Sequence, residues 1–134
     1  MNVAAQPPVS PKPVLLVEDD DGLRGALAAC LRVAGFPVMA AADERSALRC
    51  FAERECAAVV SDLILPQGEG FKTVQAMRKS QPDVPIIVMS GGGWFAANDL
   101  LGLASSLGAN AAISKPFNPA ALIQMVRELT PKAA

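Results

Sequence analysis

Five short apolar runs without polar alternation constrain the fold of this chain more than any other feature. They occupy residues 14–17, 38–41, 57–60, 86–89 and 111–113. Unbroken apolar runs of this length suit β-strands that are buried on both faces. Strands of this kind are typical of a parallel sheet whose two faces are covered by helices.

The segments between these runs have the spacing of amphipathic helices. Apolar residues recur there every three or four positions, which places them on one helical face. The stripes contain Leu23, Leu27, Cys30, Leu31 and Ala34, then Leu48, Phe51 and Ala52, then Phe71, Val74 and Met77, then Leu100, Leu103, Ala104 and Leu107, and finally Leu122, Met125, Val126 and Leu129. Five strand–helix units in alternation predict an α/β fold with helices on both faces of a parallel sheet.

Residues that commonly begin and end helices flank these stripes. Asp43 and Asn118 are placed as N-caps, and Pro119 fits the first turn of the last helix. Gly35 and Gly108 stand near expected helix ends, where a glycine often terminates the helix.

The size and composition favour one soluble domain. The chain has 134 residues, of which 51% are hydrophobic and 19% charged, enough apolar material for a packed core. We expect a flexible lead-in at residues 1–12, a domain at residues 13–130, a short tail at 131–134 and no output domain. No signal peptide or membrane-spanning run is evident, so we expect a cytoplasmic protein.

Charge and residue usage exclude several function classes. Twelve basic and thirteen acidic side chains give a net charge of −1, which offers no overall attraction to nucleic acid or anionic membranes. The absence of histidine excludes Ser-His and Cys-His catalysis and histidine metal sites. The three cysteines form no CxxC pair and are interpreted as core thiols in a reducing compartment.

Acidic residues follow two of the predicted strands. Glu18 and Asp19 come directly after the first strand, and Asp62 ends the third. The carboxyl ends of parallel strands gather ligands at one sheet edge. If these carboxylates converge there, an all-oxygen site without histidine favours magnesium. Asp20 and Asp21 have a simpler interpretation, as the N-cap and favourable first-turn charge of the next helix.

The fourth and fifth predicted strands end in residues suited to a phosphoryl group. Ser90 and Gly91 follow one, and Lys115 follows the other. A hydroxyl, a backbone amide and an ammonium group can all bind phosphoryl oxygens. The nucleotide-binding pattern GxxxxGK[ST] is absent, so a nucleotide site is not expected.

This combination resembles the receiver domain of two-component response regulators. The matching segments are residues 14–20 (VLLVEDD), 61–66 (SDLILP), 68–70 (GEG), 88–90 (VMS) and 115–117 (KPF), in the family's order. The resemblance implies a flavodoxin-like fold with five parallel strands in the order 2-1-3-4-5.

The resemblance also implies a role for each site residue. Asp62 would be the phosphoacceptor, and Glu18 and Asp19 the acidic pair that serves Mg²⁺, with the backbone carbonyl of Ile64 completing the metal site. Ser90 and the amide of Gly91 would bind the phosphoryl group. Lys115 would stabilise its charge.

The implied protein is a stand-alone receiver and not an enzyme in its own right. Its donor would be a phosphohistidine on a histidine kinase or a histidine phosphotransfer protein. Phosphorylation would alter the surface formed by the fourth helix, fifth strand and fifth helix, and so change the affinity for a downstream protein. The apolar cluster Leu100, Leu101 and Leu103 makes a homodimer through this face plausible.

Two departures from the family pattern affect these expectations. Ala112 stands where many receivers have an aromatic switch residue, so that side-chain rotation cannot report phosphorylation. Ile64 and Gly92 occupy the positions whose side chains orient hydrolytic water in receivers. Neither side chain can hydrogen-bond to water, so we expect slow self-dephosphorylation.

Two other functions are alternatives to this one. A constitutive docking module with the receiver fold would never be phosphorylated, but every charged or hydroxyl position of the site is filled. A Mg²⁺-dependent phosphohydrolase with Asp62 as its nucleophile usually has a second acid two residues later, where this chain has Ile64.

Overall fold

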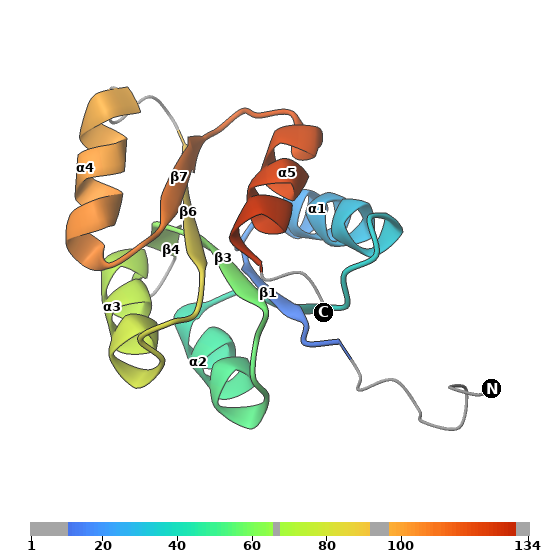
Figure 1. The fold of residues 1–134 in the computed structure, drawn as a ribbon, viewed down its shortest axis with the longest axis horizontal. Coiled ribbons are helices and arrows are strands. Elements are labelled where there is room, and N and C mark those ends of the chain that lie inside the picture. The colour runs from blue at the N-terminus through green and yellow to red at the C-terminus, as the bar shows by residue number, and fades with distance from the viewer. Residues whose placement is uncertain (1–10, 66–67, 92–96, 131–134) are drawn as a thin grey trace.

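A computed structural model describes residues 11–65, 68–91 and 97–130 (Figure 1). Its main sheet contains five parallel strands, β1 (Val14–Val17), β2 (Val38–Ala41), β3 (Ala58–Asp62), β6 (Ile86–Ser90) and β7 (Ala111–Ser114). They are arranged in the order β2-β1-β3-β6-β7, which is the 2-1-3-4-5 order expected from the resemblance. The expected lead-in and tail lie largely outside the described residues.

Helices cover both faces of this sheet, as predicted. Their bounds are α1 (Asp21–Val33), α2 (Glu44–Glu53), α3 (Gly70–Ser80), α4 (Ala97–Leu107) and α5 (Pro119–Leu129). Helices α1 and α5 lie together on one face, and α2, α3 and α4 lie on the other (Figure 1). Within the described ranges, no helix is long and apolar enough to cross a membrane.

The alternating side chains of the buried strands supply two separate cores. Leu15 and Val17 point into the core beneath α2, α3 and α4, whereas Val14 and Leu16 point into the core beneath α1 and α5. All four are fully buried. The unbroken apolar run at 14–17 is therefore explained by a strand that has a hydrophobic core on each side.

The helix ends confirm the capping predictions. The Asp43 carboxylate accepts a hydrogen bond from the amide of Ser46 (2.8 Å), and the Asn118 side chain accepts one from Ala120 (2.9 Å). Gly35 and Gly108 adopt positive φ angles of 103° and 91° just after α1 and α4. Positive φ is favourable for glycine and strained for other residues, which explains why glycine ends both helices.

One element differs from the sequence prediction. Residues Ile64–Leu65 (β4) and Gly68–Glu69 (β5) form a small antiparallel pair between β3 and α3. The sequence does not reveal this pair because each strand has only two residues, too few for alternation to be detected.

Arg78 hydrogen-bonds to the loops that follow α3 and α4, at the end of the sheet opposite the carboxyl ends of the strands. Its guanidinium donates to the carbonyls of Gly108 (2.7 Å), Pro82 (2.6 Å) and Gln81 (3.2 Å), and to the side-chain oxygen of Asn110 (2.8 Å). The same Asn110 oxygen accepts a hydrogen bond from the amide of Ile86, the first residue of β6. Arg78 thus fixes the ends of α3 and α4 relative to the start of β6.

We expect Arg78→Ala to lower the free energy of unfolding by about 2 kcal/mol, because hydrogen bonds from a charged donor are lost and their acceptors lose a partner. Urea unfolding followed by circular dichroism measures this change. Arg127→Ala is the matched control, since within the described residues Arg127 makes only one long contact, with the Ala34 carbonyl (3.4 Å). Equal stability of the two variants would contradict the role assigned to Arg78.

Candidate functional site

The polar residues singled out in the sequence meet at one edge of the sheet. Glu18 follows β1, Asp62 ends β3, Ser90 ends β6 and Lys115 follows β7. The parallel register aligns the ends of these strands, with Asp62 opposite Met89. Glu18, Asp62 and Ser90 are each at most 5% exposed. Burial of three polar side chains at one place requires partners for them.

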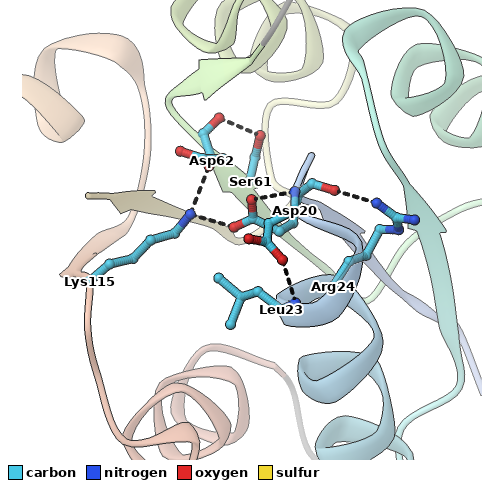
Figure 2. Close-up of polar contacts among 7 residues, drawn as sticks. Asp20, Leu23, Arg24, Ser61, Asp62 and Lys115 are labelled. Carbon is cyan, nitrogen blue, oxygen red and sulfur yellow. Dashed lines mark hydrogen bonds and ion pairs between the residues drawn. The ribbon is translucent and has the colours of Figure 1, made fainter. Parts of the chain in front are cut away.

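Three carboxylates and one ammonium group form the centre of the site. Carboxylate oxygens of Glu18, Asp19 and Asp62 all lie within 4.8 Å of one another. Lys115 Nζ donates to Asp62 Oδ2 (2.8 Å) and to Glu18 Oε1 (Figure 2). Three negative charges and one positive charge leave the ionised cluster with a net charge of −2.

The loop after β1 is held by its own polar groups. Glu18 Oε2 accepts a hydrogen bond from the amide of Asp20 (3.1 Å), so both oxygens of this buried carboxylate are hydrogen-bonded. The Asp20 carboxylate caps α1 by accepting from the amide of Leu23 (2.8 Å). Asp21 lies in the first turn of α1. The simpler interpretation of Asp20 and Asp21 is therefore correct.

The cluster shifts the pKa of two of its members. Burial raises the pKa of Glu18, opposed by hydrogen bonds from Lys115 and Asp20, and the charge of Asp62 raises it further. Burial alone would lower the pKa of Lys115, but its hydrogen bonds to Asp62 and Glu18 outweigh burial and raise it. Lys115 is therefore cationic at neutral pH.

The donor set fits a small divalent cation. Carboxylate oxygens are the ligands that Mg²⁺ prefers, and the net charge of −2 is the charge that such an ion neutralises. Asp19 is exposed whereas Glu18 and Asp62 are buried, so an ion reaching the cluster from solvent meets Asp19 first.

The ends of β6 and β7 lie together beside this cluster. The amide of Lys115 donates to the carbonyl of Ser90 (2.7 Å), which joins the ends of β6 and β7. Gly91 lies against the Lys115 side chain, because a Cβ built on Gly91 would be 3.5 Å from Lys115 Cδ. Ser90, Gly91 and Lys115 therefore lie together at the same edge as Asp62.

Comparison with known proteins identifies the family. The sequence matches the model of the response regulator receiver domain over residues 14–127. The chain belongs to this receiver domain family.

The solved structures agree with this assignment. A putative response regulator from Chloroflexus aurantiacus superposes with a TM-score of 0.80 and 29% identity, covering 90% of this chain and 98% of the other. The chemotaxis response regulator CheY4 of Vibrio cholerae superposes with a TM-score of 0.78 and 28% identity, over 88% and 98% of the two chains.

Among curated proteins, the probable transcriptional regulator ycf27 of Cyanophora paradoxa is 34% identical over 121 residues, which is 90% of this chain and 49% of that protein. The putative NtrX-like response regulator of Rickettsia bellii is 34% identical over 118 residues, which is 85% of this chain and 24% of that protein. The chain spans half or less of the length of these two relatives.

Three positions singled out by the family resemblance are Ile64, Gly92 and Ala112. Ile64 begins β4, two residues after Asp62, and pairs with Glu69. Gly92 lies outside the described residues. Ala112 is half-buried on β7, pairs with Val88 and packs at the margin of the core beneath α4. The position that is aromatic in many receivers therefore holds a methyl group on β7, the edge strand of the sheet.

Sequence reasoning missed two contacts in the receiver site. Arg24 donates a hydrogen bond to the carbonyl of Glu18 (3.0 Å). The sequence contains a hint of this contact, because a cation in the first turn of a helix is unfavourable unless it has a partner outside the helix. Gly70 begins α3 so close to β3 that an added Cβ would be 2.4 Å from the Leu63 carbonyl oxygen. Only the family motif marks Gly70 in the sequence.

An apolar hollow of about 360 Å³ borders the site on the side of Lys115. It is lined by Leu23 and Leu27 of α1 and by Gly91, Lys115, Pro116, Phe117 and Pro119. The hollow provides apolar surface next to the charged cluster.

Proposed function

We propose that this receiver domain accepts a phosphoryl group on Asp62, with Mg²⁺ bound by Glu18, Asp19, Asp62 and the carbonyl of Ile64. The observation that carries the proposal is the hydrogen bond from Lys115 to the buried Asp62, within a cluster of three carboxylates and one ammonium whose ionised groups sum to a net charge of −2. When bound, Mg²⁺ supplies positive charge that offsets the carboxylates and the oxygens of the transferred group.

In the proposed reaction, a carboxylate oxygen of Asp62 attacks the phosphorus of a phosphohistidine. The new O–P bond forms as the P–N bond breaks, and the leaving imidazole nitrogen keeps the bonding electron pair and then takes a proton from solvent. Lys115 stabilises the charge on the phosphoryl oxygens, and the Ser90 hydroxyl and Gly91 amide donate hydrogen bonds to them. The chain is the acceptor and not a separate enzyme.

Phosphorylation is proposed to signal through the surface of α4, β7 and α5. Ser90 and Gly91 connect β6 to the segment before α4, so their movement toward a phosphoryl group would be transmitted to that helix. Leu101 on α4 is 56% exposed, which supports a protein contact there, either with a downstream target or with a second copy of the chain.

The proposed donor is a histidine kinase or a histidine phosphotransfer protein, and the proposed location is the cytoplasm. A protein donor has to bury surface beside Asp62. The apolar hollow next to Lys115 offers such surface.

Donor chemistry tests this function. We expect phosphoramidate, a small donor with a P–N bond, to phosphorylate the protein in the presence of Mg²⁺, and ATP to give no product. EDTA should abolish the reaction. Labelling from ATP would indicate a kinase or nucleotide site instead, and no labelling from any P–N donor would favour a docking module that is never phosphorylated.

The phosphorylated form should be long-lived, because neither Ile64 nor Gly92 has a side chain that can hydrogen-bond to the attacking water. We expect the adduct to persist for minutes or longer after the donor is removed, as followed by intact mass. Ile64→Asn places an amide there and should shorten the lifetime. Decay of the wild-type adduct within seconds would contradict this prediction.

A further inference from the structure

Arg24 makes two contacts that connect α1 to the acidic loop. Its guanidinium donates to the backbone carbonyl of Glu18 (3.0 Å) and to Asp21 Oδ1 (2.7 Å), as Figure 2 shows for the first of them. The Arg24 side chain is only 22% exposed, whereas that of Asp21 is 89% exposed. The contact with the Glu18 carbonyl is therefore the more shielded of the two.

The Glu18 carbonyl belongs to the peptide that joins Glu18 to Asp19, at the point where the strand ladder stops. The amide of Glu18 still donates to the Ala41 carbonyl of β2 (3.0 Å). The Arg24 guanidinium donates a hydrogen bond to the carbonyl of Glu18. These two bonds hold the backbone on both sides of the Glu18 Cα, and so set the direction in which the chain enters Asp19.

The location of Arg24 is electrostatically unfavourable for the helix alone. It is the fourth residue of α1, near the positive end of the helix dipole. Among the described residues, its guanidinium contacts the Glu18 carbonyl and Asp21, whereas the Lys115 ammonium bonds to the carboxylates of Glu18 and Asp62. Arg24 thus supports the backbone beneath the cluster, and Lys115 supplies the charge within it.

We propose that Arg24 is a positioning residue for the metal site: by fixing the Glu18 carbonyl, it orients Asp19 and thereby sets the affinity for Mg²⁺. The inference rests on the proposed function, since it assumes that Mg²⁺ binds to Glu18, Asp19 and Asp62. Groups that orient metal ligands typically change metal affinity by about 10-fold or more.

The test measures Mg²⁺ affinity from the thermal midpoint of unfolding as a function of Mg²⁺ concentration, and compares it with the phosphorylation rate from acetyl phosphate. We expect Arg24→Ala to raise the dissociation constant for Mg²⁺ by about tenfold. At saturating Mg²⁺, the phosphorylation rate should return to within about twofold of wild type, because Arg24 does not touch the reacting atoms. The dissociation constant of Arg24→Lys for Mg²⁺ should lie between those of wild type and Arg24→Ala, since one ammonium cannot make both hydrogen bonds of the guanidinium.

Two variants provide matched controls. Asp21→Asn removes the exposed salt bridge but keeps the Glu18 contact, and Arg32→Ala removes an exposed arginine from the last turn of α1. Both should bind Mg²⁺ as wild type does. If Arg24→Ala does not fold, the Mg²⁺ affinity of Arg24→Lys is compared with that of wild type instead.

Distinct results overturn the inference and the proposed function. Wild-type Mg²⁺ affinity in both Arg24 variants, or an equal loss in Asp21→Asn, would overturn the positioning role alone. A wild-type protein that neither binds Mg²⁺ nor accepts a phosphoryl group would overturn the proposed function, and the inference with it.

Discussion

Replacing Lys115 with methionine should lower the free energy of unfolding by about 2–3 kcal/mol at pH 7 in the absence of divalent cations. Methionine keeps most of the length of the side chain but removes the ammonium that bonds to Asp62 and Glu18. The Glu18 side chain is only 1% exposed, so its charge would lose its cation without gaining water. Unpaired buried charge is among the costliest results of a single substitution.

The pH dependence of this loss follows from the direction of the Glu18 pKa shift. Burial and the charge of Asp62 raise the pKa of Glu18 above its ordinary value of 4.5. The hydrogen bond from Lys115 opposes this increase, and the substitution removes it. The folded variant therefore holds the Glu18 proton more tightly than the unfolded chain does. Its stability relative to wild type should recover as the pH falls from 7 toward 4.5, and decline again as the pH rises through the folded-state pKa.

Urea unfolding of the Lys115→Met variant between pH 4.5 and 7.5, with and without Mg²⁺, measures these effects. Mg²⁺ should stabilise the variant more than the wild type, because loss of the Lys115 ammonium changes the net charge of the ionised cluster from −2 to −3. Lys79→Met, at an exposed lysine in the last turn of α3, is the control for loss of one positive charge. A Lys115→Met variant as stable as this control at every pH would show that Lys115 does not offset buried negative charge in the cluster.

Gly70→Ala should be the second damaging substitution, with a loss of about 3 kcal/mol. A Cβ at this position would be 2.4 Å from the carbonyl oxygen of Leu63 and 2.5 Å from that of Asp62. Both obstacles are backbone atoms, so α3 itself has to move away from β3. Because one of the crowded carbonyls belongs to Asp62, phosphorylation should slow as well.

A second glycine-to-alanine change gives the matched comparison. Gly25 is exposed in α1, and no atom lies within 4 Å of a Cβ built there. Gly25→Ala should raise stability by about 0.5–1 kcal/mol, because alanine loses less conformational freedom in a helix. Thermal and urea unfolding of both variants should thus give changes of opposite sign. A neutral Gly70→Ala would show that α3 can shift at little cost.

The main elements were predictable because local sequence and tertiary packing agree. The run at residues 14–17 is apolar at every position since successive side chains enter two different cores. Asp43 and Asn118 cap helices with their own side chains, which accept hydrogen bonds from amides two or three residues later. Their role can therefore be predicted from the local sequence alone. The β4–β5 pair was not predictable, because two-residue strands carry no periodic signal.

The site was predictable by residue but not by contact. The carboxyl ends of parallel strands share one edge, which is sufficient to group Glu18, Asp62 and Lys115. That one ammonium bonds to both carboxylates is a property of tertiary geometry. The same holds for Arg24, whose use depends on the orientation of a backbone carbonyl six residues earlier.

Intact mass spectrometry of wild type and Asp62→Asn, after incubation with acetyl phosphate and Mg²⁺, shows whether Asp62 accepts a phosphoryl group. Wild type should gain the mass of a single phosphoryl group, EDTA should prevent the gain, and Asp62→Asn should remain unmodified while folded. An equal gain in Asp62→Asn, or no gain in a wild-type protein shown to bind Mg²⁺, would mean that Asp62 is not a phosphoacceptor.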